Sequence, residues 1–390
     1  MIIQKLNLFN IFWGLYLFEF ITPFVLILNY LTGIDVFYLI KITPVLYVAV
    51  IFIFHLKNVL ILKPISILFI ATGILSIFLG IFFGNSLDYK FLMHVYYATI
   101  PIIGISFGYH FARSLNTKFY AFLLRIFNYC FYLTLIVLLI YFYFHFITGQ
   151  ISYWGFGTDI HILLPFLLNQ SKYTFIFLSI VFVLLSGKRA TTLNIFLDLI
   201  IYYSAFIFPI KLKSLLKYLP FLIALLAVII IGAQQGAFVR LESSLSFNSE
   251  DEYSTLVATG GRWQEVLGII EHHSKNPIKW LIGAGFGGRY LWEIPFGGYS
   301  EIKHYAHFTP IAYIFIFGIP FTAVLYIMFI KIFIKGWVLR KNPFFILFCV
   351  SIFGSFFGAN LLVDIKIWVF VGIAYYLVNS KEKFTFIDFL

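Results

Sequence analysis

The sequence is short of charged residues, and this shortage excludes most classes of soluble protein. Only 11% of its 390 residues are Asp, Glu, Lys or Arg, whereas 62% are hydrophobic and the mean hydropathy is +0.98. A soluble globular domain has about 25% charged residues. Because a water-soluble core cannot bury so large an apolar share, the composition predicts a protein that lies in a membrane.

Cysteine is also scarce, with only Cys130 and Cys349 in the chain, and both fall within apolar stretches. Two such thiols exclude a disulfide framework and a cysteine-based metal site. The sequence further lacks a phosphate-binding P-loop, an HExxH zinc motif, paired CxxC motifs and a nucleophile elbow. We therefore expect neither a cofactor nor a bound metal.

A glycine-rich stretch, residues 283–288, does fit the GxGxxG pattern of dinucleotide-binding proteins. That pattern indicates a dinucleotide only after a strand and within a βαβ unit. Here it falls in a polar segment between apolar runs. We therefore expect a turn whose backbone comes close to a ligand or to another helix.

Long apolar runs with polar or basic flanks recur along the whole chain, for example residues 131–144, 175–185 and 221–231. They show no ten-residue alternation of apolar and polar side chains, which argues against a transmembrane barrel. Because backbone groups must be hydrogen-bonded within lipid, the runs are expected to be helices. The first run, Ile11 to Leu28, has no cleavage site after it, so we interpret it as the first transmembrane helix.

The distribution of charge predicts which segments face the cytoplasm. Residues 234–305 hold eight of the 16 acidic residues but only six of the 27 lysines and arginines, so the rest of the chain carries 21 basic and eight acidic residues. Short basic loops mark the cytoplasmic side of a membrane. The net charge of +11 then suits attraction of the basic loops to anionic lipid headgroups, and no nucleic acid is expected as a partner.

Following the basic loops predicts an all-α, polytopic membrane protein of about twelve transmembrane or re-entrant helices in a single domain, residues 1–390. Parity requires two crossings between Gln150 and the Ser186–Arg189 turn. The polar residues 169–172 supply a turn between two short helices there. The largest aqueous segment, residues 233–307, is expected to be an extracytoplasmic loop.

Two arginines on the expected outer side suggest contact with an anion. Arg189 ends an apolar run, where an unpaired guanidinium is costly, so an anionic group is expected beside it. Arg262 follows Gly260 and Gly261, which leave the backbone exposed, and its guanidinium suits bidentate contacts to phosphate. An ion pair between Arg262 and Glu265 is an equally good interpretation.

Two further pairs of histidines lie in the same region. His304 and His307 precede the apolar run that starts at Phe308, and if this entry is helical they point roughly the same way. An imidazole there could exchange protons near neutral pH, although an interfacial hydrogen-bonding histidine is the more common case. The adjacent His272 and His273 lack the spacing of a helical metal pair, so we expect solvated loop residues.

Together these elements resemble the bacterial O-antigen polymerase and O-antigen ligase family, membrane glycosyltransferases that act on polyprenyl-pyrophosphate-linked glycans. The resemblance covers roughly residues 153–321 and rests on the order and spacing of several short motifs. They are Ser186-Gly187-Lys188-Arg189, Gly261-Arg262-Trp263, Asn276-Pro277, Gly283-Ala284-Gly285-Phe286-Gly287, and His307 followed by Gly318 eleven residues later. The family usually has Asn after the histidine and often an aromatic two residues further, where this chain has Phe308 and Pro310.

The resemblance implies a metal-independent transfer of a glycan from undecaprenyl pyrophosphate to a sugar hydroxyl. Arg189 and Arg262 would stabilise the departing pyrophosphate. His307 would accept the proton of the attacking hydroxyl, with Glu265 as the alternative base.

The remaining expected substrate contacts are His304, Arg289, Glu265 and Trp263. The aromatic loop residues Trp263, Tyr290 and Trp292 either stack on sugar faces or pack against one another within the loop, and the sequence does not distinguish these alternatives.

The resemblance further implies a multi-pass protein of the bacterial cytoplasmic (inner) membrane with an active site facing the periplasm. We expect an O-antigen or related surface-polysaccharide polymerase, with membrane lipids, a chain-length regulator and a flippase as partners. Transfer to lipid A core would instead make the protein an O-antigen ligase. A polysaccharide-lipid transporter or flippase is the competing class, because Glu19, Lys41 and Asp198 fall within apolar runs. A structural scaffold is a weaker third option.

Overall fold

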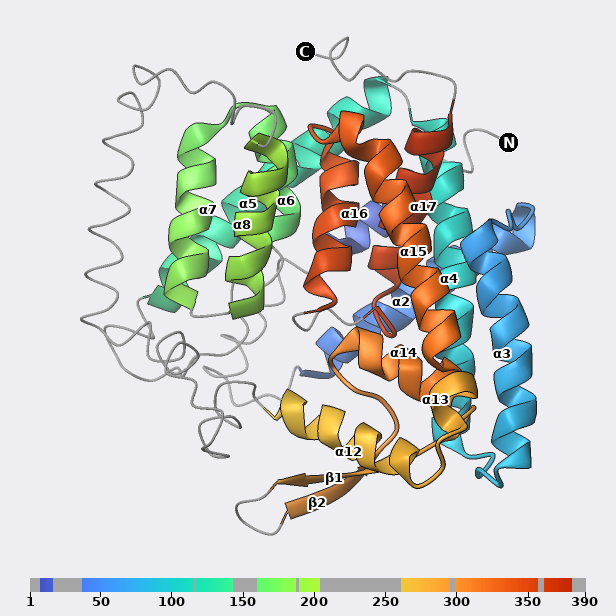
Figure 1. Cartoon of the computed structure of the whole chain (residues 1–390). Coiled ribbons are helices and arrows are strands. Elements are labelled where there is room, and N and C mark those ends of the chain that lie inside the picture. The colour runs from blue at the N-terminus through green and yellow to red at the C-terminus, as the bar shows by residue number, and fades with distance from the viewer. Residues whose placement is uncertain are drawn as a thin grey trace.

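The computed structural model describes residues 8–16, 37–115, 117–142, 160–186, 189–203, 261–294, 299–356 and 361–380. Most of the first apolar run, the run at residues 221–231 and the first part of the expected outer loop lie outside these ranges. The described chain is mostly helical, as predicted (Figure 1).

The described chain begins with a helical segment at residues 8–16, and seven helices follow it before residue 204. They are α2 (Phe37–Lys57), α3 (Pro64–Phe82), α4 (Tyr89–Ser114), α5 (Thr117–Phe142), α6 (Ile160–Asn169), α7 (Tyr173–Ser186) and α8 (Arg189–Tyr203). The described elements after residue 204 are α12 (Arg262–Ser274), α13 (Lys279–Ile282), β1 (Tyr290–Ile294), β2 (Tyr299–Lys303), α14 (Thr309–Phe317), α15 (Ile319–Gly336), the 3-10 turn η2 (Trp337–Leu339), α16 (Pro343–Gly354) and α17 (Ile365–Asn379).

Three of the described helices are long and apolar enough to cross a membrane: α3, α4 and the segment Ile319–Leu339. α3 carries large apolar side chains on its outer surface, among them Phe78 and Ile81, which are 65% and 56% exposed. Such a face is unfavourable in water and suits lipid. The structure therefore supports a helical membrane protein, and the total of twelve spans stays a prediction.

The core of the bundle is built on close contact between α4 and α17. A Cβ on Gly108 would lie 2.0 Å from the Val369 carbonyl oxygen, and one on Gly372 would lie 2.2 Å from that of Ile105. Small residues permit such approach between membrane helices. The large indole of Trp368 fills the space beside this contact and is fully buried.

The predicted turn at residues 169–172 is present between two short antiparallel helices, α6 and α7, where Ser171 has a φ of 55°. Asn169 Nδ2 donates to Tyr120 Oη at 3.0 Å, so this turn lies beside the start of α5. Tyr202 Oη donates to the Leu168 carbonyl oxygen at 3.1 Å, so α8 ends there too. The start of α8 therefore lies at the opposite end of the bundle, where α4 begins.

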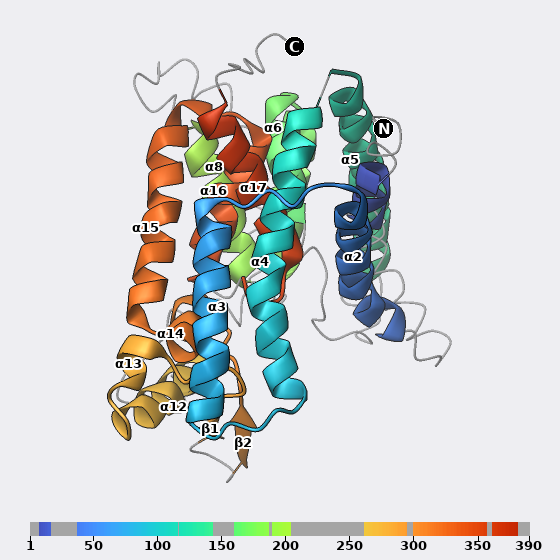
Figure 2. The same cartoon turned by 90° about the vertical axis from the view of Figure 1, so that its right-hand side faces the viewer.

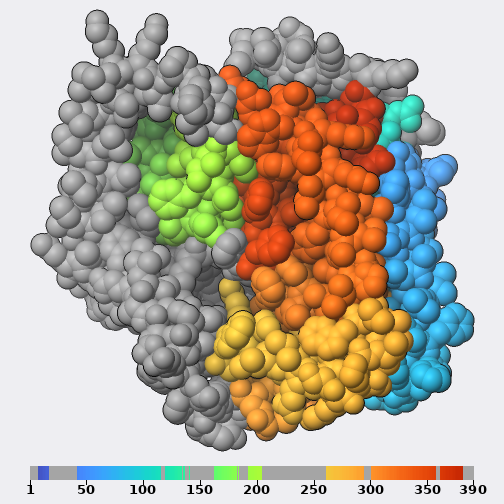
Figure 3. Space-filling model, in the orientation of Figure 1, coloured from blue at the N-terminus to red at the C-terminus, as the bar shows by residue number. Residues whose placement is uncertain are grey.

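A separate layer formed by α12, α13, β1 and β2 covers that end of the bundle. α3 and α4 run side by side, and the layer lies at the end of α3 and the start of α4 (Figure 2). The strands pair antiparallel, with Tyr290 opposite Lys303 and Trp292 opposite Glu301. On the visible face, α12 and α13 form a continuous surface with α14 and α15 (Figure 3). The short hairpin is an addition to the predicted all-α architecture, because this polar layer lies outside the apolar helices and no lipid constraint requires it to be helical.

Candidate active site

The glycine-rich stretch at residues 283–288 packs its backbone against α3. Gly283, Gly285 and Gly287 have positive φ values of 79°, 70° and 77°, which residues with side chains rarely adopt. A Cβ on Gly80 of α3 would lie 2.3 Å from the Phe286 carbonyl oxygen. An antiparallel hairpin follows the stretch, and the described residues around it form no βαβ unit. The geometry therefore fits the predicted close turn against another helix.

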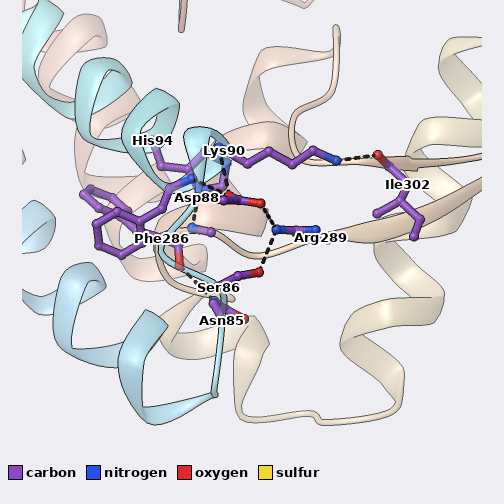
Figure 4. A network of polar contacts seen from close by, with 10 residues as sticks. Asn85, Ser86, Asp88, Lys90, His94, Phe286, Arg289 and Ile302 are labelled. Atoms are coloured by element: carbon purple, nitrogen blue, oxygen red, sulfur yellow. Dashed lines mark hydrogen bonds and ion pairs between the residues drawn. The ribbon is translucent and has the colours of Figure 1, made fainter.

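Polar side chains from the α3–α4 connection hold this stretch in place (Figure 4). Asn85 Nδ2 donates to two carbonyl oxygens of the glycine-rich stretch, both at 2.9 Å. Arg289 donates to Ser86 Oγ at 2.7 Å and forms an ion pair with Asp88. The Arg289 guanidinium, which we expected to contact substrate, thus anchors the layer to the membrane helices. This ion pair places the α3–α4 connection beside the segment that was expected to form the outer loop.

Asp88 joins α4 to the layer. As the N-cap of α4, its carboxylate accepts from the backbone N–H groups of Lys90 and Phe91 at 3.0 and 3.4 Å. Lys90 Nζ donates to the Ile302 carbonyl oxygen of β2 at 3.1 Å. Desolvation raises the pKa of Asp88, but the two amides and the Arg289 charge outweigh this effect and hold the pKa below its ordinary value of 3.8.

His94, in the second turn of α4, is fully buried and ties two segments of the layer to that helix. The Gly287 N–H donates to His94 Nδ1 at 3.1 Å, and His94 Nε2–H donates to the His304 carbonyl oxygen at 2.8 Å. These two bonds require a neutral imidazole with its proton on Nε2. The His304 ring lies parallel to that of Tyr97, with an interplanar angle of 2°. α4 therefore fixes the segment that leads into His307.

Glu265 and His307 form the central pair of the site. Glu265 lies in the first turn of α12 and is only 2% exposed. His307 Nδ1–H donates to Glu265 Oε1 at 2.8 Å, and the His307 backbone N–H donates to Oε2 at 2.8 Å. The carboxylate thus fixes both the backbone and the ring of His307. The lone pair on Nε2 of His307 is directed away from Glu265. The His307 side chain is 42% exposed, so the ring lies at the surface of the site.

Lys303, at the end of β2, is the third member of this group. Its Nζ donates to Glu265 Oε1 at 2.9 Å and lies 3.5 Å from the centroid of the Trp292 ring. The sequence allowed an ion pair between Glu265 and Arg262, and in the structure the carboxylate is bonded to Lys303 and His307. Because both carboxylate oxygens are buried and already accept hydrogen bonds, Glu265 is placed to orient His307 rather than to contact a substrate.

Burial raises the pKa of Glu265, because the ionised carboxylate loses its hydration. The hydrogen bonds and charge of His307 and the bond from Lys303 outweigh that effect, so the pKa lies below its ordinary value of 4.5. Burial and the negative charge of Glu265 raise the pKa of the Tyr290 and Tyr305 hydroxyls. At neutral pH the site therefore holds a carboxylate beside neutral tyrosines.

Arg262 begins α12, directly after Gly261, which has a φ of 81° and provides no side-chain cap. A helix N-terminus carries a partial positive charge, so Arg262 lies where an anion is favoured. Trp263 is 47% exposed. By contrast, Tyr290 is 2% exposed, and Trp292 donates its Nε1–H to the Gly261 carbonyl oxygen at 3.2 Å. Of the three aromatic residues expected to stack on sugars or pack, Tyr290 and Trp292 pack within the layer.

Arg189 is the first residue of α8. The start of α8 lies at the same end of the bundle as α12, which agrees with the predicted common side for Arg189 and Arg262. A shared contact of the two arginines with one anion stays a prediction.

The condition under which His304 and His307 would point the same way, a helical entry to the apolar run at Phe308, is not met. Residues 304–308 are not helical, and α14 begins only at Thr309. His304 lies against α4, whereas His307 turns to Glu265. Burial and the positive charge of Lys90 lower the pKa of His304. His304 is thus placed to hold the segment in position.

The expectation of solvated loop histidines at 272 and 273 is also wrong, because α12 turns this pair toward α13 and α14. His273 is fully buried and its ring packs against Trp280 and Phe315. Burial, together with the neighbouring positive charge, lowers the pKa of both histidines to about 4. They are neutral packing residues at physiological pH.

Sequence analysis gave no role to Lys303, Asp88 or His94. An ionisable residue inside an apolar run, such as His94, is a signal that could have been used. Lys303 had no comparable signal, since its role depends on the hairpin.

In the part of the chain that the structure describes, no group of three or more His, Cys, Asp or Glu side chains is placed to hold a metal ion. The chain matches no family model, no curated protein and no solved structure. The resemblance to the O-antigen family therefore stays a prediction, and the function is argued from the chemistry of the site.

Proposed function

We propose that the protein is a membrane glycosyltransferase that joins undecaprenyl-pyrophosphate-linked oligosaccharide repeats into a surface polysaccharide such as O-antigen. The observation that carries the proposal is the Glu265–His307 pair at the end of an apolar helical bundle. A base at this end can meet a lipid-linked substrate whose sugar projects from the membrane. The resemblance to the O-antigen family supports the same reaction class.

In the proposed reaction His307 is the general base. Glu265 holds the proton on Nδ1, so the Nε2 lone pair accepts the proton of the acceptor sugar hydroxyl. The hydroxyl oxygen attacks the anomeric carbon of the donor as the bond from that carbon to the pyrophosphate oxygen breaks. The bond electrons leave with the pyrophosphate. The carboxylate of Glu265 stabilises the imidazolium that forms, which is the role of an orienting acid beside a catalytic histidine.

The departing pyrophosphate gains negative charge and needs fixed positive charge nearby. Arg262 and the N-terminus of α12 supply it in the proposal, and Arg189 approaches from the start of α8. Such positioned charge typically lowers a barrier by several kcal/mol. These groups suffice for the chemistry, so the proposal assigns no step to a metal or cofactor.

Trp263 is the exposed aromatic beside Arg262 and is assigned to sugar stacking. Arg289, His304 and Glu265, which sequence analysis treated as substrate contacts, are assigned instead to holding the loop and the base in place. This assignment follows from their partners, which are Asp88, the α4 aromatic residues and His307.

Glycan profiling in cells that lack the gene tests the proposal. Complementation with the native gene should restore a ladder of long chains, whereas His307→Ala, Arg262→Ala and Arg189→Ala should leave a single repeat on the acceptor. The matched control is Glu271→Gln, because Glu271 is an exposed acid on α12, the helix that begins with Arg262; this variant should restore the ladder. Full ladders in all three site variants, with normal amounts of protein in the membrane, would refute the proposal.

The acceptor distinguishes a polymerase from a ligase. Purified protein given only lipid-linked repeats should produce ladders on the lipid. Ladders that require added lipid A core would identify an O-antigen ligase instead.

A further inference from the structure

Two polar residues of α8, Asn194 and Asp198, face inward among its buried residues, whereas two large apolar residues face outward. Phe196 and Ile200 are 47% and 57% exposed, whereas Asn194 is 6% exposed and Asp198 is fully buried. α8 packs against α6, α7 and α16. Residues 194 and 198 are one helical turn apart, so their side chains lie next to each other on the buried face. Ionisable residues in membrane helices are rare, face the interior and mark functional sites.

This buried face has an excess of hydrogen-bond acceptors. Among the described residues, both carboxyl oxygens of Asp198 and the side-chain oxygen of Asn194 are buried without a hydrogen-bond partner. Three neighbouring buried acceptors without a donor are unfavourable, because each loses its hydrogen bonds to water and gains none within the protein. One additional donor placed between them would remove most of that penalty.

Among the side chains that the structure describes, no lysine or arginine lies near enough to compensate a charge on Asp198. The titratable residues on the packed elements are Cys349 of α16, Tyr173 of α7 and His161 of α6. α8 itself carries Arg189, Tyr203 and Tyr202, whose hydroxyl donates to the Leu168 carbonyl oxygen. An ionised, unpaired carboxylate is therefore strongly disfavoured here.

We propose that Asp198 is a proton-binding site of the membrane domain, where the carboxylic acid carries a proton and donates it in a hydrogen bond to the Asn194 side-chain oxygen. The proton supplies the missing donor and removes the unpaired charge in one step. Glycosyl transfer at His307 does not use this group, so the inference goes beyond the proposed function. A proton held at this depth is what a proton-linked conformational step requires.

A hydrophobic carbodiimide tests for the proton on the full-length protein in lipid vesicles at pH 7. The acid transfers its proton to a carbodiimide nitrogen, and its oxygen bonds to the central carbon. The resulting O-acylisourea rearranges to a stable N-acylurea that mass spectrometry locates. We expect an adduct on Asp198 and its loss in Asp198→Asn. Glu271, which is exposed, and Asp364, which is half-buried, are each paired with a lysine, serve as internal controls and should remain unlabelled.

Infrared spectroscopy supplies a second readout that needs no reagent access. The native protein should show a protonated carboxyl band at pH 7 that shifts in D2O, is lost in Asp198→Asn, and shifts without loss in Asn194→Leu. Absence of both the adduct and the band would overturn the proposal, because the group would be ionised. Protection of Asp198 by Na⁺ at constant pH would also overturn it, in favour of a metal cation. Neither readout depends on glycan transfer, so a failure of the proposed function leaves this test unaffected.

Discussion

Glu265 and Asp198 are both buried carboxyl groups, yet the chain surrounds them in opposite ways. Glu265 accepts three hydrogen bonds, from the ring and backbone of His307 and from Lys303. Asp198 accepts none from the described residues. The first lies in the polar layer outside the bundle and the second lies between apolar helices.

The difference shows that burial alone does not determine ionisation. Donors and a cation keep Glu265 charged although it is only 2% exposed, and their absence keeps Asp198 neutral. A charged carboxylate can orient an imidazolium, whereas a neutral acid can only hold or release a proton. The two regions are therefore suited to different chemistry, and variants at each should respond differently.

The largest effect is expected for Glu265→Gln. The amide loses the negative charge that stabilises His307 as an imidazolium, so glycan transfer should fall by about 10³-fold. Initial rates with a purified lipid-linked donor measure this loss. Glu271→Gln should keep the native rate. A nearly normal rate in Glu265→Gln would show that the carboxylate is structural, and the contrast with Asp198 would lose its functional meaning.

His94→Leu tests how far the membrane helices support the layer. It leaves the buried Gly287 N–H and the His304 carbonyl oxygen without partners, at about 1–3 kcal/mol each. We expect a lower thermal midpoint in detergent and a reduced rate, with partial recovery in His94→Gln, which retains a donor and an acceptor. An unchanged midpoint would mean that the contacts of Asn85, Lys90 and the Asp88–Arg289 ion pair hold the layer without His94.

Sequence reasoning reached the helical membrane architecture and the α6–α7 turn because both follow from apolar runs and loop charge. It also selected Arg262, Glu265 and His307 as neighbours in function. The hydrogen bonds between Glu265 and His307 could not be predicted from the sequence, because they depend on a non-helical segment before Thr309. The hairpin that brings Lys303 to Glu265 was missed because its register is set by contacts with α12, which no local pattern encodes.

Lys303→Met should have a smaller effect, about 1–2 kcal/mol, because one charge-assisted hydrogen bond to Glu265 is lost. The lowered pKa of Glu265 gives stability that is present above its unfolded value and lost as the pH falls through the folded pKa. Without Lys303 the folded pKa rises toward 4.5, so acid unfolding should begin at a higher pH.

Thermal unfolding followed across an acidic pH series measures this change. Lys275→Met is the control, because Lys275 and its partner Glu271 are 73% and 64% exposed, and an ion pair so open to solvent should contribute little to stability. Identical acid profiles for native protein and Lys303→Met would show that His307 alone keeps Glu265 ionised.

The smallest effect is expected for Asp198→Asn, which sharpens the comparison directly. A neutral acid and a neutral amide have similar size and hydrogen-bonding capacity, so the substitution should change stability by less than about 1 kcal/mol at pH 7. If Asp198 were instead ionised without a partner, replacing it would remove an uncompensated buried charge and raise the thermal midpoint by several degrees. Because Glu265→Gln is expected to be harmful and Asp198→Asn nearly silent, measuring both variants under one condition separates a carboxylate used as a charge from one that stores a proton.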